Sequence, residues 1–117
     1  MKKLTGFFFL LLLGAVVEAG AQTPNFTLDR NLFKPSTDLK VTSVFTPVFS
    51  GNSQFILYDT AGEVIKNFKP GALTANVPQT FTWDGKNDSG EPVASGFYFF
   101  RFTVDLGTFT KKLLVVR

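Results

Sequence analysis

The stretch WDGKNDSGEPVASGFYFF, residues 83–100, is either a metal-binding or catalytic loop or a turn between two β-strands. Its first half places acidic and amide side chains around two glycines, and its second half is rich in aromatic residues. An EF-hand-type calcium loop requires the pattern D-x-[DN]-x-[DN]-G. Counted from Asp84, the third position is Lys86 and the sixth is Ser89, so a cation would meet an ammonium group where it requires a carboxylate. The pattern therefore argues against calcium binding.

Catalysis by this loop is equally weakly supported. Asp84 and Asp88 could form an acid and base pair, but the glycine-flanked loop offers no apolar pocket that would raise a pKa. The chain has no histidine to accept a proton, and Ser89 has no base partner in the sequence. The absence of cysteine excludes thiol catalysis and thiolate metal sites. We therefore predict no catalytic residue, no metal site and no cofactor.

A connecting turn explains more of the same residues. Asp84-Gly85 and Ser89-Gly90 are turn dipeptides, and the side chains of Asn87 and Asp88 are suited to bonding their own backbone in Asx-turns. Pro92 prevents a helix on the way out of the loop. We interpret residues 84–92 as a connector between strands.

The rest of the chain reads as β-structure. No segment after Val17 shows the spacing of an amphipathic helix, whereas runs of Val, Ile, Thr and Phe recur between clusters of turn residues. In residues 38–46, one face is expected to carry Leu39, Val41, Ser43 and Phe45. The pattern predicts an all-β fold, an immunoglobulin-like antiparallel β-sandwich of about seven strands. The expected strands are 26–30, 38–46, 53–59, 63–68, 79–83, 96–105 and 108–117, with 69–78 crossing between the sheets.

The N-terminal segment has the three parts of a secretory signal peptide. A basic start is followed by an uncharged apolar run from Leu4 to Val17 and by the small residues Ala19, Gly20 and Ala21. The run is shorter than the roughly 18 residues that a membrane-spanning helix needs. We predict a cleavable signal peptide over residues 1–21 and a single domain over 22–117; an uncleaved anchor is the alternative. The mature chain would be exported across the inner membrane, to the periplasm, the cell surface or the medium, with no transmembrane span.

The charge of the chain is modest. The formal net charge is +3, and the basic residues are scattered among acidic ones. Such a surface lacks the basic stripe of a nucleic-acid-binding protein. Nucleic acid is therefore not an expected partner.

Three stretches together resemble one known family. The run WDGKNDSGEPVASGFYFFRF, the hairpin-like LYDTAGEVIKNF and the opening NLFKPSTDLKV are similar to motifs of the FlgD-type Ig-like domain family. The resemblance covers about residues 31–117, with Leu32 standing where a proline is common in the family. It implies structural roles for three residues: Trp83 as a core anchor, Gly96 as the turn into a strand, and Tyr98 as a buried ring whose hydroxyl bonds the backbone.

The resemblance leaves several functions open. Members include the Ig-like part of the flagellar hook cap and domains of secreted bacterial proteins, among them type IX sorting signals. A hook cap is exported without a cleaved signal peptide, and a sorting domain requires cargo upstream of it, so neither is the first expectation here. We expect a secreted, non-catalytic structural or interaction module, and keep a sorting domain and a small-ligand or glycan-binding module as alternatives.

The contact surface is expected in the last strand. Leu113, Leu114, Val115 and Val116 form an unbroken apolar run, and a terminal strand can lie at a sheet edge with unpaired backbone groups. The expected partners are other envelope or extracellular proteins, with self-association as an alternative. The competing interpretation is an internal strand buried on both faces. The aromatic residues of 97–102 pose a related question, because rings fall on both faces of that strand, and the outward ones are either covered by loops or exposed.

Overall fold

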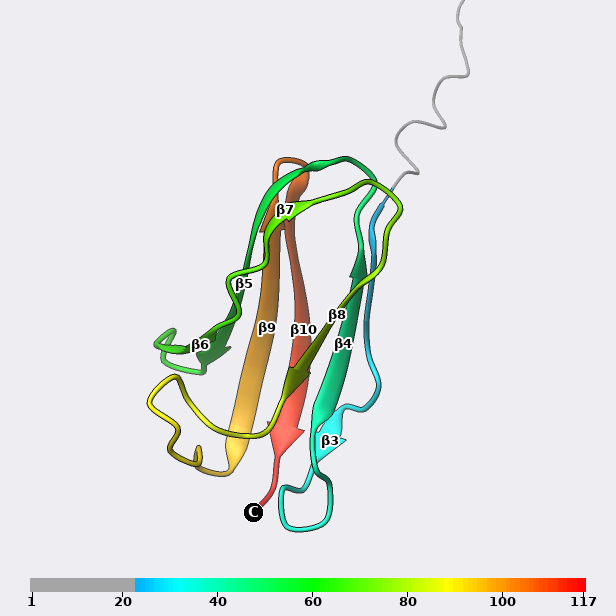
Figure 1. Ribbon diagram of the computed structural model, residues 1–117. Coiled ribbons are helices and arrows are strands. Elements are labelled where there is room, and N and C mark those ends of the chain that lie inside the picture. The colour runs from blue at the N-terminus through cyan, green and yellow to red at the C-terminus, as the bar shows by residue number, and fades with distance from the viewer. Residues whose placement is uncertain (1–22) are drawn as a thin grey trace, which may run out of the picture.

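A computed structural model describes residues 23–117, and the predicted signal peptide lies outside this range. Figure 1 shows an all-β molecule, which confirms the predicted fold class. Among the described residues, no helix is long and apolar enough to cross a membrane. The nine strands of this part of the chain are β2 (Asn25–Leu28), β3 (Leu32–Phe33), β4 (Val41–Thr46), β5 (Gly51–Asp59), β6 (Val64–Asn67), β7 (Gly71–Leu73), β8 (Gln79–Trp83), β9 (Gly96–Val104) and β10 (Gly107–Val115).

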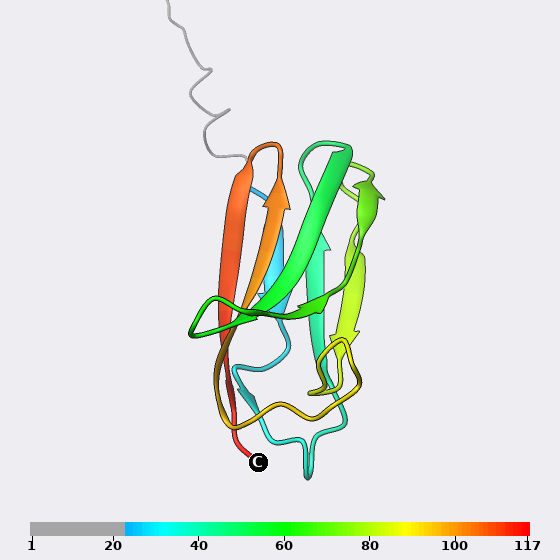
Figure 2. The ribbon, with the colours of Figure 1, turned by 90° about the vertical axis from the view of Figure 1, so that its left-hand side faces the viewer.

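The strands form two sheets that pack face to face. The large sheet has the order β3-β10-β9-β5-β6, with β7 also paired to β5, and the small sheet has the order β2-β4-β8. Figure 1 shows the two layers side by side, and Figure 2 looks onto the large sheet. Every pair is antiparallel except β3 with β10. The strands beyond the seven expected are the short β3 and β7.

Alternating side chains determine which face of each strand enters the core. In β4, Val41, Ser43 and Phe45 are buried, as the sequence pattern predicts. Leu39 departs from that pattern: it lies before the strand begins and its side chain is 89% exposed. In β9, Tyr98 is among the inward residues.

The core is built from phenylalanine rings and one indole. Phe55 of the large sheet lies in a stacked or tilted arrangement with several rings, including that of Phe81 at 5.0 Å between centroids. Trp83 closes the core at the other end, 5.9 Å from Phe33 and 5.8 Å from Tyr98. Burial of large aromatic side chains provides most of the favourable free energy available to a domain of this size that has no disulfide.

The segment 69–78 is only partly the structureless crossover that the sequence suggests. It does carry the chain from the large sheet to the small one, but it contains β7, whose residues Gly71 to Leu73 pair with Ser53 to Gly51 of β5. Gly71 has a φ of 72°, a conformation that favours glycine, and a strand of three residues gives almost no alternation in the sequence.

Candidate functional site

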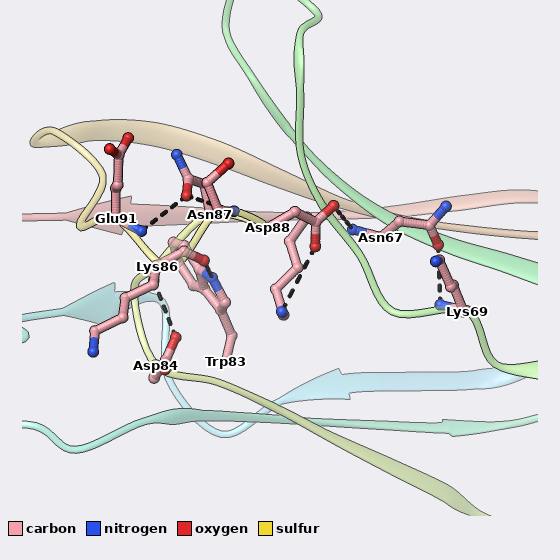
Figure 3. Close-up of polar contacts among 10 residues, drawn as sticks. Asn67, Lys69, Trp83, Asp84, Lys86, Asn87, Asp88 and Glu91 are labelled. Atoms are coloured by element: carbon pink, nitrogen blue, oxygen red, sulfur yellow. Dashed lines mark hydrogen bonds and ion pairs between the residues drawn. The ribbon is translucent and has the colours of Figure 1, made fainter.

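Two polar side chains of the loop after β8, those of Asp84 and Asn87, bond to the backbone of the loop itself (Figure 3). The Oδ1 atom of Asn87 accepts hydrogen bonds from the backbone N–H groups of Ser89 and Glu91, both at 2.9 Å. Oδ1 of Asp84 accepts one from the N–H of Lys86 at 3.1 Å. These are Asx-type turns, in which Oδ1 of each side chain holds the backbone of the loop in a fixed shape.

Asp88 ties the loop to the large sheet instead of to its own neighbours. Its Oδ2 accepts a hydrogen bond from the N–H of Asn67 at 3.1 Å, and its Oδ1 lies 3.7 Å from Nζ of Lys66 (Figure 3). The N–H of Asp88 donates to the carbonyl of Ile65 at 3.0 Å. The contacts of Asp88 are therefore with β6, and none of them is with Asp84. Among residues 23–117, no cluster of three acidic side chains is arranged to hold a metal ion.

The three residues that the family resemblance marks as structural lie around this loop. Trp83 is 1% exposed, and its Nε1 donates to the carbonyl of Lys86 at 2.7 Å. Tyr98 is buried, and its hydroxyl donates to the carbonyl of Ala94 at 2.7 Å. Gly96 is the first residue of β9 and has a φ of 151°. Burial raises the pKa of the Tyr98 hydroxyl, and the negative charge of Asp59 raises it further.

Arg117 forms hydrogen bonds to the same loop and to the residues that follow it. Its Nε donates to the carbonyl of Val93, and its Nη2 donates to the carbonyl of Gly85 at 2.9 Å. Its backbone N–H also donates to Oγ of Ser95 at 2.9 Å. In the sequence Arg117 is only a basic residue after an apolar run, so the sequence does not predict this set of three hydrogen bonds, which we call the Arg117 clamp. The loop is a fixed connector whose side chains stabilise the end of the sandwich.

The side chains of the apolar run 113–116 point alternately to the two faces of the large sheet. Leu113 and Val115 have no exposed surface and belong to the core. β3 covers the end of the edge that was expected to be open: the N–H of Leu114 donates to the carbonyl of Asn31, and the N–H of Val116 donates to the carbonyl of Phe33. The end of β10 is therefore internal to the large sheet, but it is not buried on both faces as the competing interpretation requires: only the face of Leu113 and Val115 enters the core. Leu114 is half-buried and Val116 is 39% exposed, both outside the core.

These outward residues belong to a patch that crosses three strands. Leu32 of β3 and Phe97 of β9 both pair with Leu114 of β10, and they are 41% and 43% exposed. We call Leu32, Phe97, Leu114 and Val116 the sheet-face patch. Phe97 is also one of the outward aromatic residues of 97–102 that could have been covered by loops. No loop covers its ring, so at this position the aromatic side chain is exposed.

Cationic side chains lie on the rings of the same face. Nζ of Lys112 is 4.9 Å from the centroid of the Phe97 ring, and the guanidinium carbon of Arg101 is 4.7 Å from that of Tyr58. A cation above an aromatic face is attracted by the ring quadrupole while its charge remains in water. The outer face of the large sheet therefore combines apolar surface with positive charge.

Comparison with known proteins agrees with this architecture. The family model described as FlgD Ig-like domain matches residues 33–107, which confirms the resemblance found in the sequence. No curated protein sequence gives a significant match. Among solved structures, FlgD from P. aeruginosa is 26% identical with a TM-score of 0.50, and the alignment covers 64% of this chain and 61% of that one.

Two further structures come from Porphyromonas gingivalis. PorZ, described as an essential bacterial surface component of the type IX secretion system, is 17% identical with a TM-score of 0.55 over 89% of this chain. PorU, solved as a latent dimer, is 21% identical with a TM-score of 0.59 over 80% of this chain. These two likenesses show the fold alone. The chain spans 12% of PorZ and 9% of PorU, so it corresponds to a small part of each.

Proposed function

Since the chain belongs to the FlgD Ig-like domain family, we propose that it is a non-catalytic Ig-like module that binds another protein of the cell envelope or the extracellular space through the sheet-face patch. The observation that carries the proposal is the row Leu32, Leu114 and Phe97, in which three apolar side chains from three adjacent strands lie side by side and remain accessible. Water-exposed apolar surface of this kind is a favourable site for association.

The positive charges around the patch indicate the charge of the partner surface. Lys112 lies against Phe97, and Arg101 lies further along the same face of β9. Charges at the rim of an interface contribute to specificity and to the association rate. The expected partner is therefore a protein whose contact surface has an apolar centre surrounded by acidic residues.

Export of the domain is supported by the N-terminal sequence. Residues 1–21 have the basic, apolar and small-residue parts of a signal peptide. PorZ, which shares the fold, is itself described as a bacterial surface component. The proposed location is the periplasm, the cell surface or the medium, and an intact mass of the exported protein that begins at Gln22 would support it. Retention of Met1 would contradict the proposed processing.

A charge placed in the patch tests the binding proposal. Leu114→Lys adds a charge at a half-buried position in the centre of the patch, and Thr110→Lys adds the same charge at an exposed position of the same strand, outside the patch. Partners are captured with a photo-crosslinking residue in place of Phe97, from the native envelope fraction. Leu114→Lys should lose the cross-linked partner while remaining folded by circular dichroism, and Thr110→Lys should retain it. A folded Leu114→Lys variant that keeps its cross-linked partner would show that the patch is not the contact.

A further inference from the structure

A pocket lies at the end of the sandwich opposite the loop after β8. It has a volume of about 310 Å³ and is bounded by the β4–β5 connection, the β9–β10 turn and β7, near the top of Figure 1. Its walls are mostly apolar and include Pro47, Phe49, Leu73, Val104 and Leu106. Mostly apolar concave sites with a few polar groups are typical of binding pockets. The sheet-face patch shares no residue with this pocket.

The walls of the pocket are fixed by backbone contacts. The carbonyl of Pro47 accepts a hydrogen bond from the N–H of Asn76 at 2.8 Å, and Oγ of Ser50 accepts one from the N–H of Ala75 at 2.9 Å. Leu73 is held in place by the pairing of β7 with β5. The β4–β5 connection is thus bonded to a segment more than twenty residues away, and the pocket is formed before any ligand arrives. A preformed site loses less conformational entropy on binding.

One carboxylate stands at the wall of this apolar pocket. Asp105 lines it, and its Oδ2 lies against Gly51, where an added methyl group would be 3.4 Å away. Within residues 23–117, neither an ion pair nor a hydrogen bond engages this carboxylate. A carboxylate beside apolar surface attracts a cation that is attached to an apolar group, because both parts of such a ligand find a complementary contact.

The rim of the pocket indicates how large the ligand is. Phe49 is 61% exposed and Leu106 is 49% exposed, so both side chains extend beyond the pocket itself. A small amine would fill the cavity and leave these side chains in water. A polypeptide can place one side chain inside and cover the rim with its flanking residues, which removes more apolar surface from water.

We propose that this pocket binds a segment of a partner polypeptide in which a large apolar side chain is adjacent to a lysine or arginine. The apolar side chain enters between Pro47 and Leu106, and the basic group pairs with Asp105. This contact is separate from the sheet-face patch, so the two surfaces can bind independently.

The proposal is tested with two capped peptides, acetyl-Gly-Phe-Lys-Gly-amide and its analogue with glutamate in place of lysine. Binding is followed by NMR at low salt, using the amide signals of Val48, Asn52 and Leu106, on protein exported from cells that express the full chain. The lysine peptide should shift these signals and bind about fivefold more tightly than the glutamate peptide, the range expected for a partly exposed charge pair.

Four variants make the test specific. Asp105→Asn should bring the two peptides to nearly equal affinity, whereas Glu91→Gln, which removes a carboxylate from the opposite end of the molecule, should leave the preference intact. Phe49→Ala should weaken both peptides while circular dichroism stays unchanged. Leu114→Lys should have no effect, which separates this site from the one proposed for the sheet face.

Three results would overturn the proposal. The wild-type protein could bind both peptides equally, the shifted signals could lie away from the pocket, or phenethylamine could bind as tightly as the lysine peptide. The last result would assign the pocket to a small amine and not to a polypeptide.

Discussion

The ring of Phe45 stacks on the ring of Phe102, with centroids 3.8 Å apart and ring planes within 6° of parallel. Phe45 belongs to β4 of the small sheet and Phe102 to β9 of the large sheet, so this pair joins the two layers. Both side chains have no exposed surface, and the ring of Phe55 lies 4.6 Å from that of Phe102. The centre of the sandwich is therefore an aromatic cluster shared by the two sheets.

Removal of the Phe102 ring should have a large effect on stability. Phe102→Ala leaves a cavity between the sheets and should lower the free energy of unfolding by about 3–5 kcal/mol. Phe97→Ala is the matched control, since it removes the same ring from the outer face of the same strand and should cost about 1 kcal/mol or less. Urea unfolding followed by the fluorescence of Trp83 measures both. Equal losses in the two variants would contradict the inward and outward assignment of β9.

Alkaline pH should destabilise the protein through Tyr98. The pKa of its hydroxyl lies above the ordinary value of 10.0, because burial and the charge of Asp59 disfavour the phenolate, while Arg117 acts in the opposite direction. The folded state therefore keeps its proton at a pH where the unfolded state has lost it. Stability from this group is complete below about pH 10 and decreases as the pH rises from there to the folded pKa.

The variant Tyr98→Phe separates this effect from the titration of lysines. It should lose about 1 kcal/mol at neutral pH, where the hydrogen bond to Ala94 is missing, and should show a smaller loss of stability above pH 10 than the wild type. Urea midpoints between pH 7 and 11 give the comparison, and identical alkaline slopes for wild type and Tyr98→Phe would contradict it.

Two glycines of one loop should differ in their tolerance of alanine. Gly85 and Gly90 have φ values of 85° and 82°, so each substitution strains the backbone by about 1 kcal/mol. At Gly85 the new methyl group would also lie 3.1 Å from the Phe33 ring and 3.2 Å from Nη2 of Arg117, whereas Gly90 has open space. Gly85→Ala should therefore have the lower melting temperature. A Gly90→Ala variant as unstable as Gly85→Ala would show that the packing around Arg117 is not restrictive.

Calcium should not stabilise this domain. One carboxylate oxygen of Asp84 and the side-chain oxygen of Asn87 are already bonded to backbone N–H groups, and Asp88 is directed toward β6. A bound ion at a hundred times its dissociation constant would add about 2.7 kcal/mol to the free energy of unfolding. Millimolar calcium should leave the melting temperature unchanged, and Asp84→Asn should change it only slightly. A rise of several degrees that disappears in Asp84→Asn would establish a metal site.

The sequence predicts well those features that depend on local alternation and turn chemistry. The strands around Phe45 and Phe55 follow from residue types within a few positions of one another. The sequence predicts Asx-turns at Asn87 and Asp88: the side-chain oxygen of Asn87 does bond nearby backbone, whereas the prediction for Asp88 is wrong, because its carboxylate bonds to Asn67 of β6. The contacts of Asn87 involve neighbours in the chain, so their partners are visible in the sequence.

Contacts between distant segments were not predictable in the same way. β3 is two residues long and carries no alternation, so its pairing with β10 leaves no pattern, and the last strand was expected at an open edge. The clamp formed by Arg117 depends on carbonyl groups of Val93 and Gly85, which any residue type would supply. The pocket at Asp105 likewise requires the β4–β5 connection, β7 and the β9–β10 turn to meet, which alternation within one strand does not specify.

The position of β10 between β3 and β9 also determines when the domain can fold. While the ribosome is still adding residues after β9, the large sheet lacks an inner strand, and β3 has no partner to join. The core at that moment is also missing Leu113 and Val115. Contacts between the two ends of a domain are slow to form and come late. The fold is therefore completed only after β10 has been translated, so a chain whose synthesis stops after β9 should remain unfolded.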